Sequence, residues 1–422
     1  MIARLISGCK QTEAGVIPND WKVAKLGSLA SFRTGPFGSA LHKSDYVDGG
    51  IPVVNPMQIV DGRIEPTAAM TITESAARTL SDFRLQPGTI VIGRRGEMGR
   101  CAFVTEEQRG WLCGTGSMMI KPSVANDGRF LQRVLSSPVV IEAIESASVG
   151  STMLNLNQAT LANLAIPFPP TKREQEAIAG ALSDADSLTE SLEQLIAKKR
   201  HIKQGAMQEL LTGRKRLPGF TERWAEARLG DLFTFKNGLN KGKEYFGHGT
   251  PIVNYMDVFR SSVNLPHHLQ GRVEVTWAEL QNFDVKEGDV FFTRTSETIE
   301  EVGMASVVLG HPKDTVFSGF VLRGRPKDER LVDAYKAYCF QSREVREQIT
   351  SKASYTTRAL TNGKLLSSVR LRFPEPKEQT AIATILSDMD AELAALEAKL
   401  AKTRQLKQGM MRELLTGRIR LV

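Results

Sequence analysis

Apolar residues recur at helical spacing in two long stretches of the chain. In the second stretch they follow steps of four and three residues, which form the seam of a coiled coil: Ile382, Leu386, Met389, Leu393, Leu396 and Leu400. The first stretch carries a matching seam: Ile178, Leu182, Leu192, Leu195 and Ile202. Leu406, Met410 and Leu414 extend the second seam after a shift in phase. The pattern predicts two helices of about 40 residues, each roughly 60 Å long at 1.5 Å per residue.

The two helical stretches are copies of each other. Residues 174–217 and 378–421 align without a gap at an offset of 204 residues and share 26 of 44 positions. Each copy begins with Glu-Gln and closes with Leu-Leu-Thr-Gly-Arg. Gly213 and Gly417 stand where a helix would end with a left-handed glycine. One large unit is therefore used twice, in contrast to a solenoid of short repeats.

Mixed strand and helix patterns fill the rest of the chain. β-rich runs such as Thr89–Ile92 and Asp289–Phe292 follow glycine turns, and helical patterns cover Phe130–Ala147 and Leu331–Ile349. We expect an irregular, largely antiparallel sheet in each mixed region. The predicted domains are a first mixed domain at 1–170, a first long helix at 171–217, a second mixed domain at 218–374 and a second long helix at 375–422.

The two mixed domains share a frame but differ in what fills it. Trp21 and Arg94 in the first correspond to Trp224 and Arg294 in the second, and the segment 50–55 echoes 249–254. The segments between these anchors share almost nothing. This pattern is typical of a scaffold that presents two recognition surfaces, although loop drift after an old duplication accounts for the divergence equally well.

Connectivity predicts the direction of the helix pair. The second mixed domain leaves the end of the first helix and returns at the start of the second, and these points are neighbours only if the helices run antiparallel. A parallel pair would force a crossing of about 60 Å. The predicted fold class is α+β: two mixed α/β domains separated by an antiparallel pair of long coiled-coil helices, in a pseudo-twofold circular layout.

Composition places the chain among soluble globular proteins. It has 422 residues, of which 41% are hydrophobic and 24% are charged, enough for two or three domains. No apolar run approaches the roughly 20 residues of a membrane span, and residues 1–7 do not resemble a signal peptide. The four cysteines are scattered, with no CxxC pair. We therefore expect a cytoplasmic chain without a membrane partner.

Positive charge gathers near the ends of both helical repeats. The formal net charge is +8, and the clustered cations are Lys198, Lys199, Arg200, Lys203, Arg214, Lys215 and Arg216 in the first copy and Lys402, Arg404, Lys407, Arg412, Arg418 and Arg420 in the second. Such clustering raises the expectation of nucleic-acid binding. The helix dipole also favours cations at a C-terminus, so stabilisation of the helices alone explains it equally well.

The sequence contains no convincing catalytic or cofactor motif. Gly238, Gly242 and Lys243 are one residue short of a P-loop, and Gly114–Thr115–Gly116 lacks the third glycine of a dinucleotide fingerprint. The six histidines show no metal-ligand spacing. We therefore expect a non-catalytic chain that binds no metal and no cofactor.

In its motifs and their order, the chain resembles the specificity subunits of type I restriction–modification enzymes. The resemblance rests on Leu210–Arg214 and Leu414–Arg418, on the proline-rich segments Pro167–Pro170 and Phe373–Pro376 before each helix, and on the Trp-x4-Leu-Gly opening of each half. It covers nearly the whole chain, apart from about the first dozen residues.

The resemblance implies a concrete division of labour. Such subunits carry two target recognition domains, each of which reads one half of a split, asymmetric sequence in double-stranded DNA. Their helix pair sets the spacer between the half-sites and docks two modification subunits, which bind S-adenosylmethionine and methylate adenine. Restriction subunits, which use ATP and Mg²⁺, are an optional further partner. The specificity subunit itself is not an enzyme and binds none of these cofactors.

Polar residues in expected loops are the candidate DNA contacts. Arginine can bridge O6 and N7 of guanine, and Asn or Gln can bridge N6 and N7 of adenine. The candidates in the first domain are Arg33, Lys43, Asn55, Gln58, Arg94 and Arg95. Those in the second are Lys236, Asn237, Asn240, Lys241, Lys243, Asn254, Tyr255, Arg294 and Arg358. Equivalent pairs such as Arg33/Lys236 and Arg94/Arg294 suit phosphate contacts better than base reading.

Two alternatives stay open at the level of sequence. The segment Asn155–Gln158 is either a further contact loop or the cap of the short helix that follows it. The whole chain is alternatively a coiled-coil assembly scaffold whose domains bind proteins and not DNA.

Overall fold

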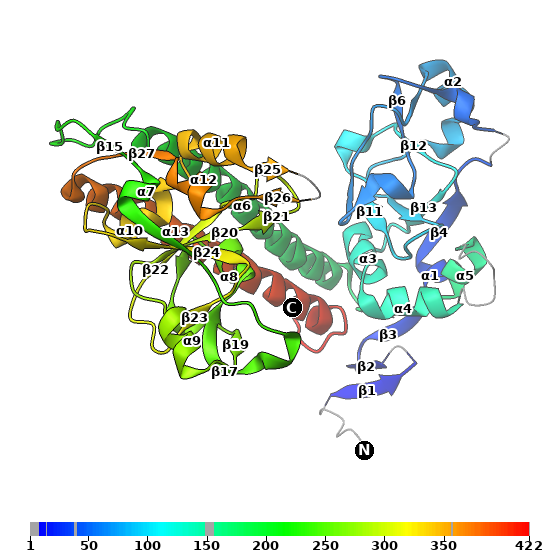
Figure 1. The fold of residues 1–422 in the computed structure, drawn as a ribbon. Helices are drawn as coiled ribbons and strands as arrows, with labels where there is room; N and C mark the ends of the chain where they lie inside the picture. Colours follow the sequence, from blue (N-terminus) through cyan, green and yellow to red (C-terminus); the bar gives the residue numbers. More distant parts are fainter. Residues whose placement is uncertain (1–7, 14, 38–39, 148–155, 356–357, 422) are drawn as a thin grey trace. The chain divides into compact units, whose positions relative to one another are not determined.

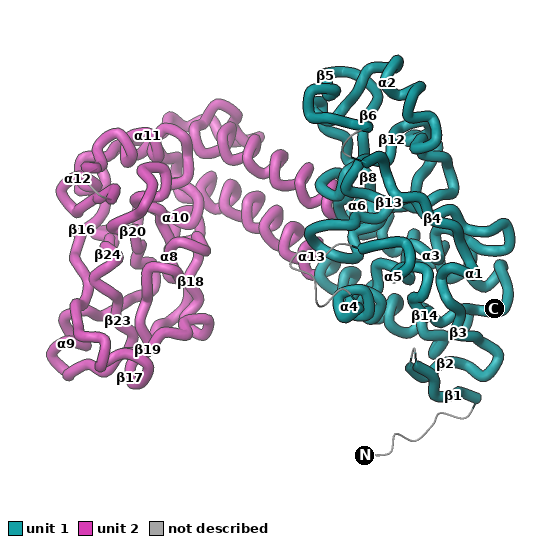
Figure 2. Tube along the Cα trace, turned by 90° about the vertical axis from the view of Figure 1, so that its right-hand side faces the viewer, with its two compact units in different colours: residues 1–192, 399–422 teal, residues 193–398 magenta. Residues whose placement is uncertain are grey.

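The computed structural model describes residues 8–13, 15–37, 40–147, 156–355 and 358–421. The chain divides into two compact units, residues 1–192 with 399–422 and residues 193–398 (Figure 2). The long helices are α6 (Lys172–Leu210) and α13 (Pro376–Leu414), each of 39 residues. Each unit therefore contains one mixed domain together with a part of both long helices.

The first unit is built on a four-stranded antiparallel sheet with the order β11-β10-β13-β4 (Figure 1). Its strands are β4 (Ala30–Thr34), β10 (Ile90–Gly93), β11 (Cys101–Phe103) and β13 (Ser117–Pro122). A second sheet, β12-β6-β9-β5, consists of β5 (Tyr46–Val47), β6 (Ile51–Val54), β9 (Thr71–Ile72) and β12 (Leu112–Cys113). The remaining strands pair in twos: β1 (Cys9–Thr12) with β2 (Gly15–Pro18), β3 (Lys22–Lys25) with β14 (Ala165–Phe168), and β7 (Ile59–Val60) with β8 (Arg63–Ile64).

The second unit has a similar plan, and its central sheet has one strand more than that of the first unit. Its central sheet has the order β16-β24-β20-β22-β18 and consists of β16 (Phe233–Asn237), β18 (Val263–Asn264), β20 (Val290–Thr293), β22 (Ala305–Val308) and β24 (Val321–Pro326). A second sheet, β19-β17-β23, contains β17 (Phe246–Val253), β19 (Arg272–Val273) and β23 (Val316–Phe317). Beside them, β21 (Thr295–Ser296), β26 (Ala359–Leu360) and β25 (Ser354–Tyr355) form a small sheet, and β15 (Ala225–Arg228) pairs with β27 (Arg370–Phe373).

Short helices connect these strands. They are α1 (Leu26–Leu29), α2 (Glu74–Thr79), α3 (Gly128–Leu135), α4 (Pro138–Ala147) and α5 (Gln158–Asn163) in the first unit. In the second they are α7 (Leu229–Leu232), α8 (Tyr255–Arg260), α9 (Trp277–Asn282), α10 (Asp333–Cys339), α11 (Arg343–Lys352) and α12 (Gly363–Ser367). The helical pattern expected at 130–147 is two helices, because Pro138 starts a new one, and that at 331–349 is broken at Ser342, which caps α11.

The mixed α/β character and the antiparallel sheets are confirmed. Parallel pairing occurs among the described strands between β12 and β6, β17 and β23, and β18 and β22. The predicted strand at 89–92 lies at Ile90–Gly93, one residue later, and the one at 289–292 lies at Val290–Thr293. None of the described helices is long and apolar enough to span a membrane.

Ion pairs within each unit show that α6 and α13 run antiparallel. In the second unit Lys199 pairs with Glu392 at 2.6 Å, and Lys203 farther along α6 pairs with Asp390 earlier on α13. In the first unit Asp186 pairs with Lys407 at 2.5 Å. Residue numbers rise on one helix as they fall on the other, which confirms the direction predicted from connectivity.

The predicted seam of α6 needs a correction in its second half. Leu195 is 38% exposed and Ile202 is 47% exposed, whereas Ile196 is only 4% exposed. The seam advances four residues from Leu192 to Ile196 and then continues through Lys199 and Lys203, whose ammonium groups form the ion pairs described above. The sequence places these lysines among the clustered cations and not in the apolar pattern, although a lysine can bury its aliphatic stem and keep its ammonium group in solvent.

The seam of α13 continues without a shift in phase. Ile382, Leu386 and Leu393 are buried, and Met389, Leu396 and Leu400 are partly buried. Thr403 is buried at the next heptad position, and Lys407 follows it. Leu406 is exposed, so the shift inferred from its apolar side chain was wrong.

Two equivalent joints fasten the long helices to their domains. In the second unit, Trp224 Nε1 donates to Glu378 at 3.1 Å, and Arg216 donates twice to the same carboxylate, at 2.7 Å each. In the first unit, Trp21 donates to Glu174 at 3.3 Å and Arg420 Nη2 donates to it at 2.8 Å. The end of one helix thus meets the start of the other and the opening tryptophan of the domain.

The repeated Leu-Leu-Thr-Gly-Arg segment is explained by these joints. Gly213 and Gly417 adopt φ of +69° and +70°, and a Cβ on either would press against Trp224 or Trp21. The adjoining leucines, Leu210 and Leu211 in one unit and Leu414 and Leu415 in the other, enter the domain cores. The left-handed helix ends predicted from the glycines are confirmed.

Candidate nucleic-acid interface

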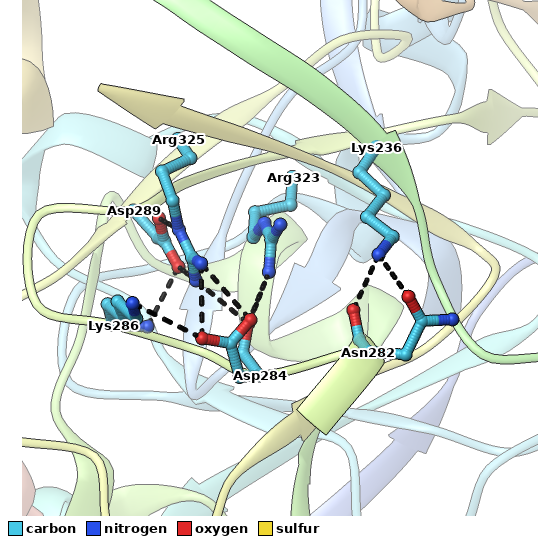
Figure 3. A network of polar contacts seen from close by, with 7 residues as sticks. All are labelled: Lys236, Asn282, Asp284, Lys286, Asp289, Arg323 and Arg325. Atoms are coloured by element: carbon cyan, nitrogen blue, oxygen red, sulfur yellow. Dashed lines mark hydrogen bonds and ion pairs between the residues drawn. The ribbon is translucent and has the colours of Figure 1, made fainter. Parts of the chain in front are cut away.

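Equivalent cations tie the first strand of each central sheet to a short helical segment. Arg33 on β4 forms a 2.7 Å ion pair with Asp82. Lys236 on β16 donates to the backbone carbonyl of Asn282 at 2.6 Å and to its Oδ1 at 2.5 Å (Figure 3). Burial, aided by the charge of Arg323, lowers the pKa of Lys236. These shared cations have partners inside their own units, and their contact with phosphate stays a prediction.

Beside Lys236, a charged network joins β24 to the segment that precedes β20 (Figure 3). Arg325 donates to the fully buried Asp289 at 2.9 and 2.7 Å and to Asp284 at 3.1 Å. Arg323 also pairs with Asp284, at 3.0 Å. Burial alone would raise the pKa of Asp284, but hydrogen bonds and positive charge from Arg325 and Arg323 outweigh it and lower that pKa. The network stabilises the sheet from which Lys236 projects.

Asparagines after two equivalent strands form capping boxes. Asn55 follows β6, and its backbone N–H donates to Gln58 at 3.2 Å. Asn254 follows β17, and its backbone N–H donates to Asp257 at 2.8 Å. Asn55 Oδ1 also accepts from the backbone N–H of Gly116 at 3.3 Å, and Gln58 is buried. Asn55 and Gln58 therefore have roles within the fold, and base reading by either stays a prediction.

Arg94 and Arg294 lie at equivalent junctions of three segments. The N–H of Arg94 donates to Gly116 at 2.8 Å, and its carbonyl accepts from Leu156 at 2.9 Å. The N–H of Arg294 donates to Phe320 at 3.1 Å, and its carbonyl accepts from Thr361 at 3.0 Å. The Arg94 side chain turns back to the Leu156 carbonyl at 2.9 Å, and burial, followed by the charge of Arg95, lowers its pKa. These arginines therefore hold the shared frame together.

The segment after the Arg94 junction is a helix cap. Asn157 accepts from the N–H of Thr160 at 2.8 Å and so caps α5, and Gln158 donates to Thr34 at 2.9 Å. Asn362 caps α12 in the same way, at 3.0 Å from the N–H of Leu365. Of the two interpretations, the structure supports the cap for Asn157, while Asn155 lies outside the described residues.

The remaining candidates differ in how free their side chains are. Lys241 is held by Glu279 at 2.8 Å and by the carbonyl of Glu274 at 2.9 Å. Tyr255 stacks on Phe259 with ring centroids 5.7 Å apart. Six candidates are exposed, and their side chains have no hydrogen bond or ion pair to another described residue: Lys43, Arg95, Asn237, Asn240, Lys243 and Arg358. These six are the side chains best able to reach a ligand.

Sequence reasoning missed the exposed apolar side chains beside these polar groups. Phe320 is next to the Arg294 junction, and Met57 and Met256 follow the two capping asparagines; all three are exposed. An apolar residue in a loop is indistinguishable in sequence from one that packs into the core. The one sequence signal for these exposed side chains was that Met57 and Met256 occupy equivalent positions in the two halves.

The helix-end cations are largely engaged with the protein itself. Arg216 and Arg420 belong to the joints, Lys199 and Lys203 to the seam, and Arg200 pairs with Glu397 at 2.6 Å. For these residues the structure favours stabilisation of the helices over DNA contact.

Two cysteines of the first unit, Cys101 and Cys113, are buried. Burial raises the pKa of the Cys101 and Cys113 thiols to about 12, so both stay protonated near neutral pH. Within the same described residues, no group of three or more His, Cys, Asp or Glu side chains is placed to hold a metal ion.

Comparison with known proteins identifies the class. The family model described as the type I restriction modification DNA specificity domain matches residues 18–200 and again residues 221–407. The chain therefore belongs to this family and carries its specificity domain twice. The resemblance to type I specificity subunits is confirmed, and the alternative of a scaffold that does not bind DNA is not favoured.

Individual relatives match nearly the whole chain. It is 22% identical to the type I restriction enzyme EcoKI specificity subunit of Escherichia coli K12, over 96% of this chain and 90% of that one. It is 24% identical to a putative MjaX specificity subunit of Methanocaldococcus jannaschii, over 98% and 96%. The crystal structure of an S subunit from M. genitalium has the same fold, with a TM-score of 0.58, 17% identity and 97% coverage of both chains.

Proposed function

We propose that this chain directs a type I restriction–modification complex to a bipartite DNA sequence, with each unit reading one half-site. The observation that carries the proposal is that the two units share structural elements but expose different polar side chains. Both units have four equivalent strands in the central sheet, an equivalent arginine junction and an equivalent helix joint. The free polar groups differ: Lys43 and Arg95 in one, and Asn237, Asn240, Lys243 and Arg358 in the other.

Lysines and arginines among these groups would position the DNA through its phosphates, whereas base edges supply sequence information. Arg95 and Arg358 suit guanine, and Asn237 and Asn240 suit adenine. Because the two sets differ in chemistry, the two half-sites are expected to differ in sequence.

The antiparallel helices α6 and α13 serve in this proposal as the ruler between the half-sites. Their two copies share 26 of 44 positions, whereas the segments that differ most lie in the domains. Two nearly equal helical surfaces suit two identical partners, which we propose are modification subunits. Restriction subunits are an optional addition.

Catalysis is assigned in this proposal to those partners. The modification subunits would bind S-adenosylmethionine and methylate adenine, and restriction subunits would use ATP and Mg²⁺. The specificity chain would act without a cofactor, in the cytoplasm.

Methylome sequencing tests the central claim. Cells that express the chain with its modification partner should carry a split methylated adenine motif that is absent without the chain. A continuous motif, or none although the partner is active, would contradict the proposal. Replacing residues 218–374 with the corresponding domain of a relative should change one half of the motif and leave the other half intact.

A salt titration separates DNA reading from protein scaffolding. The affinity of the assembled complex for its duplex should fall steeply as salt rises, because phosphate contacts release counterions. The control is the same complex with a duplex in which both half-sites are scrambled, which should bind weakly at every salt concentration. Equal affinity for both duplexes would argue for the scaffold.

A further inference from the structure

A rigid turn of the second unit holds a phenylalanine ring in solvent. Phe320 lies between β23 and β24 and is 64% exposed. Backbone hydrogen bonds fix the turn on both sides: Ser318 donates to Val253 at 2.9 Å, and Gly319 donates to Leu239 at 2.8 Å. Val321 closes it by donating to Ser318 at 3.1 Å. The ring therefore projects from a turn whose backbone is held by hydrogen bonds, and it is not part of the core.

Polar residues lie beside the turn that carries Phe320. Its carbonyl accepts from the N–H of Arg294, and the Arg294 guanidinium lies 3.5 Å from the carbonyl of Gly319. The Oδ1 of the exposed Asn240 occupies the space that a Cβ on Gly319 would need. The exposed ring of Phe320 thus lies beside Arg294 and Asn240. An arginine can contact phosphates, and a side-chain amide can contact base edges.

We propose that Phe320 inserts between bases of the half-site read by the second unit. Aromatic rings stack on bases of any type, and phenylalanine is one of the side chains that proteins insert between base steps. Arg294 and Asn240 would hold the adjacent backbone and base edge while the ring unstacks one step. The inference rests on the proposed function and adds to it a local DNA distortion and the residue that causes it.

The equivalent turn of the first unit cannot do the same. Its matching residue is Gly116, and a Cβ there would lie 2.9 Å from Pro56 Cδ. Gly116 N–H instead donates to Asn55. A change at position 320 should therefore affect one half-site and leave the other unchanged.

The test uses the chain assembled with its modification subunits and duplexes that carry its methylated motif. 2-Aminopurine replaces one base at a time in each half-site, and the domain exchange at 218–374 identifies the half that belongs to the second unit. With the unmodified complex, fluorescence should rise at one position of that half. Phe320→Ala should abolish the rise and weaken binding roughly tenfold or more. Phe320→Leu should retain most of both, because leucine also acts as a wedge.

Trp277→Ala is the matched control, since it removes a larger exposed ring of the same unit. It should bind like the unmodified complex, and both alanine variants should keep the unmodified melting temperature because neither ring is buried. An unchanged signal and affinity in Phe320→Ala, or an equal loss in Trp277→Ala, would overturn the assignment. Absence of sequence-specific binding by the unmodified complex would instead contradict the proposed function.

Discussion

Internal partners decide which polar residues can take part in recognition. Arg33, Lys236 and Lys241 have the right charge for DNA, yet each is held by a group of its own unit. Lys43, Arg95 and Arg358 have the same charge, and their side chains have no hydrogen bond or ion pair to another residue that the structure describes. Side chains of the same charge thus differ in whether they are available to contact DNA, because some of them are already paired within the fold.

Asp289 should be the most sensitive position of the charged network. Asp289→Asn removes a buried carboxylate that accepts two hydrogen bonds from Arg325, so the partly buried guanidinium keeps Asp284 as its one remaining carboxylate partner in the network. We expect a loss of about 3 kcal/mol in the free energy of unfolding, measured by urea titration. Lys286→Ala, which removes an exposed partner 3.7 Å from Asp284, should cost less than about 1 kcal/mol. Equal losses would refute the network's role.

Asp284 should make stability depend on acid pH. Its pKa lies below the ordinary value of 3.8, since the hydrogen bonds and charges of Arg325 and Arg323 outweigh its burial. Its contribution is therefore complete above the ordinary pKa and disappears as the pH falls through the lowered pKa of the folded protein. Urea unfolding of the unmodified chain and Asp284→Asn should differ by a constant amount above about pH 5 and converge in stronger acid. Divergence at low pH would contradict this.

At the scale of the element, the helix pair combines apolar and charged seam positions. The first part of each helix enters a domain core: Ile178 and Leu182 in the first unit, and Ile382 and Leu386 in the second. Farther along α6, Lys199 and Lys203 occupy the seam and pair across to α13. The apolar residues Leu195 and Ile202 are left on an exposed face.

Two neighbouring residues test the corrected seam. Ile196→Ala should destabilise the chain by about 2–4 kcal/mol, because it removes a buried aliphatic side chain. Leu195→Ala, one residue away and much more exposed, should cost less than about 1 kcal/mol. Urea unfolding of the two variants measures the difference. A larger loss for Leu195→Ala than for Ile196→Ala would instead support the seam predicted from the sequence, which contains Leu195.

At the scale of the whole molecule, duplication repeats the structural parts and lets the recognising parts diverge. The joints of Trp21, Glu174 and Arg420 and of Trp224, Glu378 and Arg216 have the same geometry in both units. The segments following the two arginine junctions differ in length and charge, as in Arg95–Gly99 and Thr295–Gly303. Under the proposed function, one frame can thus serve two half-sites.

The length of the helix pair should set the spacer of the DNA target. Deleting residues 190–196 from α6 and 397–403 from α13 removes one heptad from each helix, between the ion pairs of Asp186 with Lys407 and Lys199 with Glu392. This shortens each helix by about 10 Å, or roughly three base pairs of DNA. Methylome sequencing should show unchanged half-sites with a shorter gap. A deletion of seven residues from α6 alone breaks the register and should abolish methylation.

The sequence by itself determined the duplicated plan, the two long helices, their antiparallel direction and the family. Heptad spacing, repeated motifs and connectivity depend only on the order of residues along the chain, so they can be recognised in the sequence without a structure. The helix ends at Gly213 and Gly417 could also be predicted, because glycine is one of the few residues that tolerate a left-handed backbone.

Only the tertiary structure decided which side chains are available. Lys236 is tied to Asn282, Gln58 is buried, and Phe320 is exposed, because residues distant in sequence meet or fail to meet at these points. The seam lysines were missed for a related reason: burial of an aliphatic stem depends on the neighbouring helix and not on the residue's own polarity. Pairing and burial are set by the whole fold, whereas periodicity is set by each segment alone.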